Sequence, residues 1–207
     1  MVAKHLGMSA EVVYLDNAFD SLVFANLFCT HNCQLAKANL KARLRMATLY
    51  YFANEFSCLV VGTGNKTEIM VGYGTKYGDE GVDIQPIGDL YKTQVFQMAR
   101  ELGLPEKIIN KAPSAGLWKG QTDEEEMGIT YNELDKILRI TEGNLNQLMY
   151  GYSMGYKELC EREKVSVEKY LKVQKMMSNS QHKREMPPIC PIEFDWADRS
   201  LKNIPSV

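Results

Sequence analysis

The sequence has almost no excess of charge of either sign. Its 24 Lys and Arg residues stand against 26 Asp and Glu residues, for a formal net charge of -2. Proteins that bind nucleic acid usually carry a basic excess or a basic stripe, so we expect no nucleic-acid partner. The sequence also lacks an apolar run near the roughly 18 residues of a membrane-spanning helix, and residues 1–10 lack the apolar core of a secretory signal. We therefore expect no membrane partner and a cytoplasmic location.

Cysteine is scarce and irregularly spaced. The five cysteines are an odd number, which does not match the disulfide framework of a small secreted domain, and we interpret them as reduced thiols. Cys29, His31 and Cys33 could offer three soft ligands to a metal. No second ligand cluster follows, and zinc sites usually need four positions, so an ordinary structural segment is the favoured interpretation.

Apolar periodicity predicts an α/β fold. Residues 11–15 and 57–62 have the composition of strands, and the second lacks alternation, as expected of a parallel strand covered on both faces. Residues 82–86 form a short extended piece. Helical spacing predicts helices over residues 19–28, 36–54, 92–102, 144–162 and 166–177. Strands that alternate with helices favour a Rossmann-like parallel sheet with flanking helices, in one domain over residues 1–188 with a proline-containing tail over 189–207.

The strand that ends at Gly62 points to a binding site. Open α/β sheets bind ligands beyond the carboxyl ends of their strands. Thr63 and Asn65 can present hydroxyl, amide and N–H groups to a phosphate, and Glu68 adds a carboxylate one helical turn later. A carboxylate beside a phosphate needs a cation between them, and Mg²⁺ prefers such hard oxygen ligands. Asn65 and Glu68 also match a plain helix cap, so both interpretations stay open.

Charged residues in and beside the later loops are further candidates. Lys76 stands in a glycine-rich loop, and Lys92 begins a helix, where a cation is better explained by an anionic ligand than by the helix dipole. Asp83 alternates with apolar neighbours and could equally be an edge-strand surface residue. The basic triplet at 182–184 suits either a phosphate clamp or plain surface charge. The long aperiodic loop at 112–128 is typical of a functional segment.

Four longer segments resemble NAD synthetase. They are NLKARLRM at 39–46, VVGTGNKTEIMVGYGTKYGDEGVDIQPIGDLYKTQV at 60–95, KAPSAGLWKGQTDEEEMGITYNELD at 111–135 and HKREMPP at 182–188. The likeness runs from about residue 3 to 188. It implies an adenine nucleotide alpha hydrolase-like fold, a role in NAD biosynthesis, and a homodimer whose deamido-NAD site lies at the subunit interface.

The resemblance also implies a reaction and its residues. The family adenylates the nicotinate carboxylate of deamido-NAD with ATP, releasing pyrophosphate, and ammonia then displaces AMP to give NAD. Glu68 falls on the Mg²⁺ ligand of the family, and Asp123 and Glu124 are expected near the phosphates. The expected ATP contacts are Thr63, Lys92 and Ser114, the expected deamido-NAD contacts are Arg43, Lys76, Asp83, His182 and Lys183, and the expected catalytic residues are Lys92 and Asp83.

The sequence departs from the family at its beginning. NAD synthetases start with a strand and a Ser-Gly-Gly-x-Asp-Ser loop that cradles pyrophosphate, whereas this sequence has no Gly-Gly dipeptide. Residues 1–15 match the second unit of the family, so we expect the first strand, loop and helix to be missing. A wrong start site, a fragment, a split enzyme and an inactive dimeric deamido-NAD-binding or regulatory module all stay open, and we expect the chain by itself to bind deamido-NAD without turnover. The absence of an amidase domain favours free ammonia as nitrogen donor.

Overall fold

Helices dominate the part of the chain that the structure describes. The computed structural model describes residues 2–24, 33–116, 118, 120–149 and 154–190. The helices are α1 (Val2–His5), α2 (Asp16–Phe24), α3 (Gln34–Glu55), α4 (Lys66–Val71), α5 (Lys92–Glu101), α6 (Glu106–Ile109), α7 (Asp123–Met127), α8 (Tyr131–Met149), α9 (Tyr156–Arg162), α10 (Val167–Asn179) and α11 (Gln181–Arg184). Among these residues, none of the helices is long and apolar enough to cross a membrane.

The periodicity-based helices are largely confirmed. α3, α5 and α10 lie within a few residues of the predicted ranges 36–54, 92–102 and 166–177. The range predicted as one helix over 144–162 is wrong, because α8 ends at Met149 and α9 begins at Tyr156. Gly155 precedes α9 with extended backbone angles and serves as its N-cap, so the helical path is broken there.

The predicted sheet is reduced to one contact between two extended segments. Val61 and Ile84 form an isolated parallel bridge, in which the Gly62 N–H donates to the Ile84 carbonyl at 2.8 Å and the Asp83 N–H to the Val60 carbonyl at 3.0 Å. Val60 is buried, but Val61 is 56 % exposed. The expectation of a strand covered on both faces is therefore wrong, since only one face of the segment is covered.

Residues 11–15 are not a strand in this structure. They form neither a helix nor a strand, and Val12 and Tyr14 are 72 % and 84 % exposed. β-branched and aromatic residues favour a strand only where a neighbouring strand and a covering layer let them pair and pack. The prediction fails because the described chain supplies neither at this segment.

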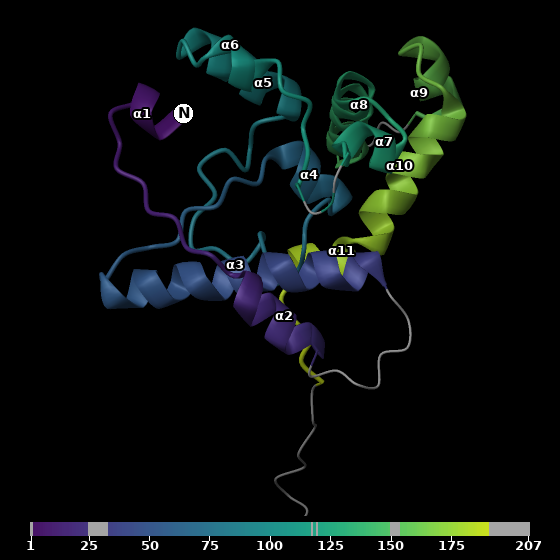
Figure 1. Cartoon of the computed structure of the whole chain (residues 1–207). Helices are drawn as coiled ribbons and strands as arrows, with labels where there is room; N and C mark the ends of the chain where they lie inside the picture. Colours follow the sequence, from purple (N-terminus) through teal and green to yellow (C-terminus); the bar gives the residue numbers. More distant parts are fainter. Residues whose placement is uncertain (1, 25–32, 117, 119, 150–153, 191–207) are drawn as a thin grey trace, which may run out of the picture.

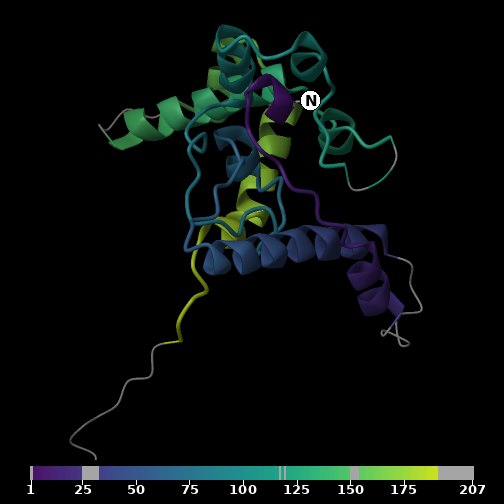
Figure 2. The same cartoon turned by 60° about the vertical axis from the view of Figure 1, so that its left-hand side comes forward.

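The hydrophobic core lies where α4, α8 and α10 meet. Its most deeply buried members are Leu134, Ile137 and Leu138 of α8, Leu159 and Cys160 of α9 and Val173 of α10. α4 and α5 both pack against α8, and α10 packs against α4, α8 and α9. In both views α3 runs along one side of the molecule with α2 against it, and α10 rises from α11 beside α3 toward α9 (Figures 1 and 2). This arrangement holds α4 and α5 side by side, with their first residues near one another.

Candidate functional site

A large cavity, the main cavity, lies between α3, α4, α5 and the loop after α6. Its volume is about 910 Å³. The sequence-predicted residues that line it are Thr63, Glu68, Lys92, Ser114, Asp123 and Lys183. The predicted ATP contacts and the predicted magnesium ligand thus line one cavity, although they come from three separate segments of the chain.

Glu68 has two tasks, so the two interpretations that the sequence left open do not exclude each other. Asn65, which is 1 % exposed, caps α4: its side chain accepts from the Glu68 N–H at 3.1 Å, and its own N–H donates to Glu68 Oε2 at 3.3 Å. The other carboxylate oxygen of Glu68 accepts from Lys92 Nζ at 2.8 Å. Glu68 therefore completes a capping box and still presents negative charge to the cavity.

Lys92 is held in place by its surroundings. Its ammonium pairs with Glu68, and both side chains are more than four-fifths buried. Nζ also lies 5.0 Å from the centre of the Tyr131 ring and 5.9 Å from that of Phe96, distances at which an aromatic face attracts a cation. The cavity wall therefore carries a fixed cation next to a fixed anion.

Sequence reasoning missed two tyrosines in this site. Tyr131 donates to Asp123 Oδ2 at 2.9 Å, and Tyr73 donates to Asp123 Oδ1 at 3.1 Å and to Glu126 Oε2 at 2.8 Å. Burial, followed by the charges of Glu68 and Asp123, raises the pKa of the Tyr131 phenol. Burial and the hydrogen bond to Glu126 raise the pKa of Tyr73 in the same direction. Both phenols stay protonated and act as donors to the carboxylates.

The two acidic residues expected near the phosphates have different surroundings. Asp123 is 4 % exposed and lines the cavity. Glu124 accepts the Tyr131 N–H at 2.7 Å, so the structure places it at the start of α8, as a cap for that helix. A sequence signal was available for this role, because Glu124 lies seven residues before Tyr131, across the turn made by Gly128 in the left-handed conformation.

Most of the predicted deamido-NAD residues are joined by hydrogen bonds. The Arg43 guanidinium donates to the Lys76 carbonyl at 3.3 Å, and Lys76 Nζ donates to the His182 carbonyl. Lys183 Nζ donates to the Gly72 carbonyl at 2.7 Å and the Gly74 carbonyl at 2.6 Å. The structure thus gathers a residue of α3, the loop after α4 and the basic end of α11, three regions far apart in the sequence.

Asp83 and Ser114 lie at the margins of this arrangement. Asp83 Oδ2 accepts the Val60 N–H at 2.7 Å, and Oδ1 accepts from Tyr50 of α3 at 3.1 Å, which turns the carboxylate toward α3. Burial and this hydrogen bond raise the pKa of the Tyr50 phenol. Ser114 is exposed, and its hydroxyl accepts the Gly116 N–H at 3.1 Å.

The predicted metal-binding alternative at Cys29, His31 and Cys33 is only partly visible. Cys29 and His31 lie outside the described residues, and Cys33 is exposed. Within the described ranges, no group of three or more His, Cys, Asp or Glu side chains is arranged to hold a metal by itself. A cation in the main cavity would need oxygen atoms from a ligand in addition to those of Glu68.

Comparison with known proteins places the chain in a family. The NAD synthase family model matches residues 1–187. The chain belongs to the NAD synthase family. It is 49 % identical over 188 residues to the NH₃-dependent NAD⁺ synthetase of Archaeoglobus fulgidus, covering 91 % of this chain and 68 % of the relative. It is 47 % identical over 191 residues to the NH₃-dependent NAD⁺ synthetase of Carboxydothermus hydrogenoformans, covering 91 % and 70 %.

Solved structures of NAD synthase family proteins share the fold. The NMN synthetase of Francisella tularensis superposes with a TM-score of 0.73 at 33 % identity, over 92 % of this chain and 70 % of that one. The NH₃-dependent NAD synthetase of Campylobacter jejuni superposes with a TM-score of 0.68 at 24 % identity, over 91 % and 69 %. The predicted family fold is confirmed at this level, whereas the described residues show a single parallel bridge in place of the expected sheet.

Proposed function

We propose that this chain serves the ATP-dependent amidation of deamido-NAD with ammonia, which gives NAD, AMP and pyrophosphate through an adenylated intermediate. The observation that supports this most is the ion pair of Lys92 and Glu68 on the wall of the main cavity, in a chain of the NAD synthase family. A nucleotide phosphate needs a cation, and a magnesium ion needs a carboxylate. This wall offers both within 2.8 Å of one another.

The chemistry explains why such a pair is useful. A carboxylate is a poor acyl donor because oxide is a poor leaving group, and its adenylate is a good one because AMP leaves readily. Negative charge then builds on the α-phosphate and on the tetrahedral intermediate, where fixed cations and oriented N–H groups stabilise it. In the proposal Thr63, Lys92 and Ser114 contact ATP, and Lys92 stabilises the developing charge.

The donor set around Glu68 suits Mg²⁺. This ion is usually held by one or two carboxylates together with the phosphates of a substrate, and Glu68 presents a largely buried carboxylate oxygen to the cavity. In the proposal Glu68 holds Mg²⁺, which supplies positive charge to the phosphates. Arg43, Lys76, Asp83 and the pair His182 and Lys183 then hold deamido-NAD, and Asp83 is the second catalytic residue.

The proposal extends to the assembly and the sheet. The chain forms a homodimer in the cytoplasm, with no nucleic-acid or membrane partner, and residues 1–188 are the catalytic domain. The segments at 57–62 and 82–86 are neighbouring strands of a Rossmann-like parallel sheet. The parallel bridge between Val61 and Ile84 supports this last point.

A second candidate function is amidation of a mononucleotide, as the name of the Francisella tularensis NMN synthetase implies. Equilibrium titration of the chain with deamido-NAD and with nicotinate mononucleotide separates the two. We expect tighter binding of deamido-NAD, and at least about tenfold weaker binding by Lys76→Ala, equivalent to about 1.4 kcal/mol. The surface variant Lys107→Ala is the matched control. Tighter binding of the mononucleotide would favour the second function, and no binding of either would contradict both.

A further inference from the structure

A carboxylate is buried where α4, α5 and α8 meet. Asp135 of α8 is 1 % exposed, and Thr67 of α4 is 0 % exposed. The Thr67 hydroxyl donates to Asp135 Oδ1 at 2.5 Å, and the Thr93 N–H donates to Oδ2 at 2.8 Å. The Thr67 hydroxyl in turn accepts the Lys92 N–H at 2.9 Å. Two residues thus bind the first two N–H groups of α5 from outside that helix.

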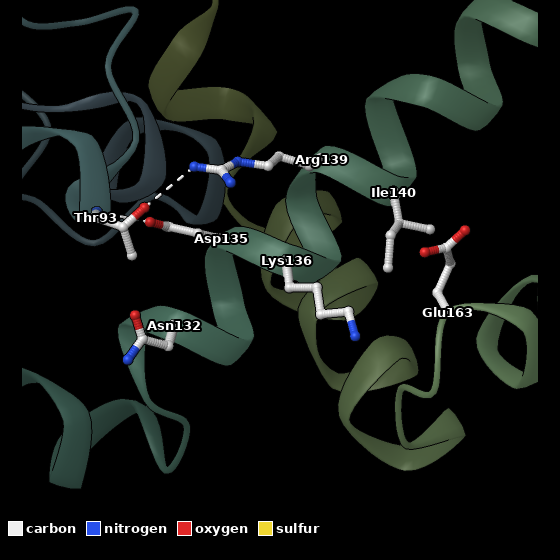
Figure 3. Close-up of a pocket in the computed structure, with 7 residues that line it drawn as sticks. All are labelled: Thr93, Asn132, Asp135, Lys136, Arg139, Ile140 and Glu163. Atoms are coloured by element: carbon white, nitrogen blue, oxygen red, sulfur yellow. Dashed lines mark hydrogen bonds between the residues drawn. The ribbon is translucent and has the colours of Figure 1, made fainter.

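These hydrogen bonds replace an ordinary cap. α5 begins after Tyr91, which is not a residue type favoured at that position, so its first N–H groups need partners elsewhere. A second residue of α8 adds to the contact, because Arg139 donates to the Thr93 hydroxyl at 3.1 Å (Figure 3). The Arg139 guanidinium also lies 4.7 Å from the centre of the Tyr91 ring. The start of α5 is therefore fixed to α8 at two points one helical turn apart.

Stability alone is a weak reason for this arrangement. A buried carboxylate is costly unless every lone pair finds a donor, and well-packed apolar residues are often at least as stabilising. The arrangement joins the backbone of Lys92 to the side chain of Thr67, the residue just before Glu68. It therefore sets the distance between the two helix starts that carry the Lys92–Glu68 pair.

We propose that Asp135 is a positioning residue for Lys92, acting through the Thr67 hydroxyl and the Thr93 N–H. Among the described residues, Asp135 and Thr67 are absent from the lining of the main cavity. Asp135 lines a separate cavity of about 440 Å³ together with Thr93 and Arg139 (Figure 3). Its effect on a ligand must pass through the ammonium of Lys92 and the carboxylate that pairs with it. The role of the Lys92 ammonium in ATP binding rests on the proposed function. The placement of Lys92 by Asp135 does not depend on that function.

The test compares four variants of the full chain. Asp135→Asn removes the buried carboxylate, and Thr67→Val removes the hydroxyl that joins Asp135 to the Lys92 N–H; these two are the relay variants. Thr67→Ser keeps the hydroxyl. Thr141→Val is the matched control, because Thr141 is a buried hydroxyl residue of α8 that bonds within α8 and to Gln174 of α10. The readout is the rate at which an amine-reactive acylating reagent labels Lys92 over a range of pH, measured by mass spectrometry. Lys66, which pairs with Asp89 and Glu142, is the internal reference.

We expect Lys92 to be labelled several-fold faster in Asp135→Asn and in Thr67→Val, with Lys66 unchanged, and parent-like rates in Thr67→Ser and Thr141→Val. In the same variants MgATP should bind at least about tenfold more weakly, with deamido-NAD affinity unchanged. Parent-like labelling of Lys92 in both relay variants, or an equal rise at every lysine, would overturn the positioning role. If the parent chain fails to bind MgATP, the proposed function fails, while the labelling rates still decide whether Asp135 positions Lys92.

Discussion

Glu68 caps a helix with one carboxylate oxygen and faces Lys92 with the other. An amide can keep the cap but carries no charge for a cation. We expect Glu68→Gln to remove most of the gain in ATP affinity that Mg²⁺ provides, a loss of at least about tenfold in affinity. The affinity for deamido-NAD should stay within about threefold of the parent value. Calorimetric titrations with and without Mg²⁺ measure this. Glu133→Gln, in an exposed pair with Lys169, is the control, and an unchanged Mg²⁺ dependence in Glu68→Gln would remove Glu68 from the metal site.

The buried tyrosines predict how stability depends on pH. The pKa values of Tyr73 and Tyr131 are raised in the folded chain, mainly by burial. Above the unfolded value of about 10, the unfolded chain loses these protons and the folded chain keeps them. The contribution of these two phenols to the free energy of unfolding is thus fully present below about pH 10. It is lost as the pH rises toward their pKa values in the folded chain. Urea unfolding should show stability falling above about pH 10, and less steeply in Tyr73→Phe. An equal slope in both proteins would contradict this.

At the level of single residues, local spacing predicted part of the site. Glu68 was found because a strand end and a helix cap meet there, and Lys92 because a cation at a helix start is unusual. Tyr131, Tyr73 and Asp135 were missed. Tyr73 and Asp135 make contacts that join residues about 40 to 70 positions apart, and Tyr131 bonds to Asp123 across the turn between α7 and α8. Neither periodicity nor capping patterns contain that information.

Two glycines with the same backbone conformation allow the cost of left-handed strain to be separated from the cost of a steric clash. Gly72 ends α4 and Gly103 follows α5, both at a φ of 65°. A methyl group at Gly72 would lie 2.1 Å from Cβ of Ser180, whereas at Gly103 it would meet no atom within 4 Å. Gly103→Ala should cost about 1 kcal/mol of unfolding free energy for left-handed strain. Gly72→Ala should cost clearly more, because Ser180, between α10 and α11, must also move. Urea unfolding measures both costs, and equal costs would show that Ser180 is not packed against Gly72.

Helices were easier to predict than strands for a physical reason. The hydrogen bonds of α3 or α10 lie within the helix, so sequence spacing contains most of the signal. A strand needs a partner from elsewhere in the chain, and a β-branched composition shows only that a segment could pair. Residues 11–15 have that composition without a partner in the described structure, and residues 57–62 pair only at Val61.

α3 and the residue after it carry several exposed apolar side chains. Leu35, Tyr51 and Phe56 are each 58–67 % exposed. Exposed apolar patches often mark contacts with another subunit, and we expect a dimer at micromolar concentration. Sedimentation velocity should show Tyr51→Glu shifted toward monomer, and Leu171→Glu, a control on the exposed side of α10, unchanged. A purely monomeric parent would contradict the homodimer.

In the proposed function, the cavity beside Lys92 and Glu68 binds a nucleoside triphosphate. Calorimetric titration of the purified chain with MgATP tests this most directly, because it needs neither the second substrate nor turnover. We predict saturable binding of one MgATP per chain, weakened at least about tenfold by Lys92→Ala and unaffected by Lys107→Ala on α6. Absence of binding in the parent, or equal affinity in Lys92→Ala, would contradict the claim.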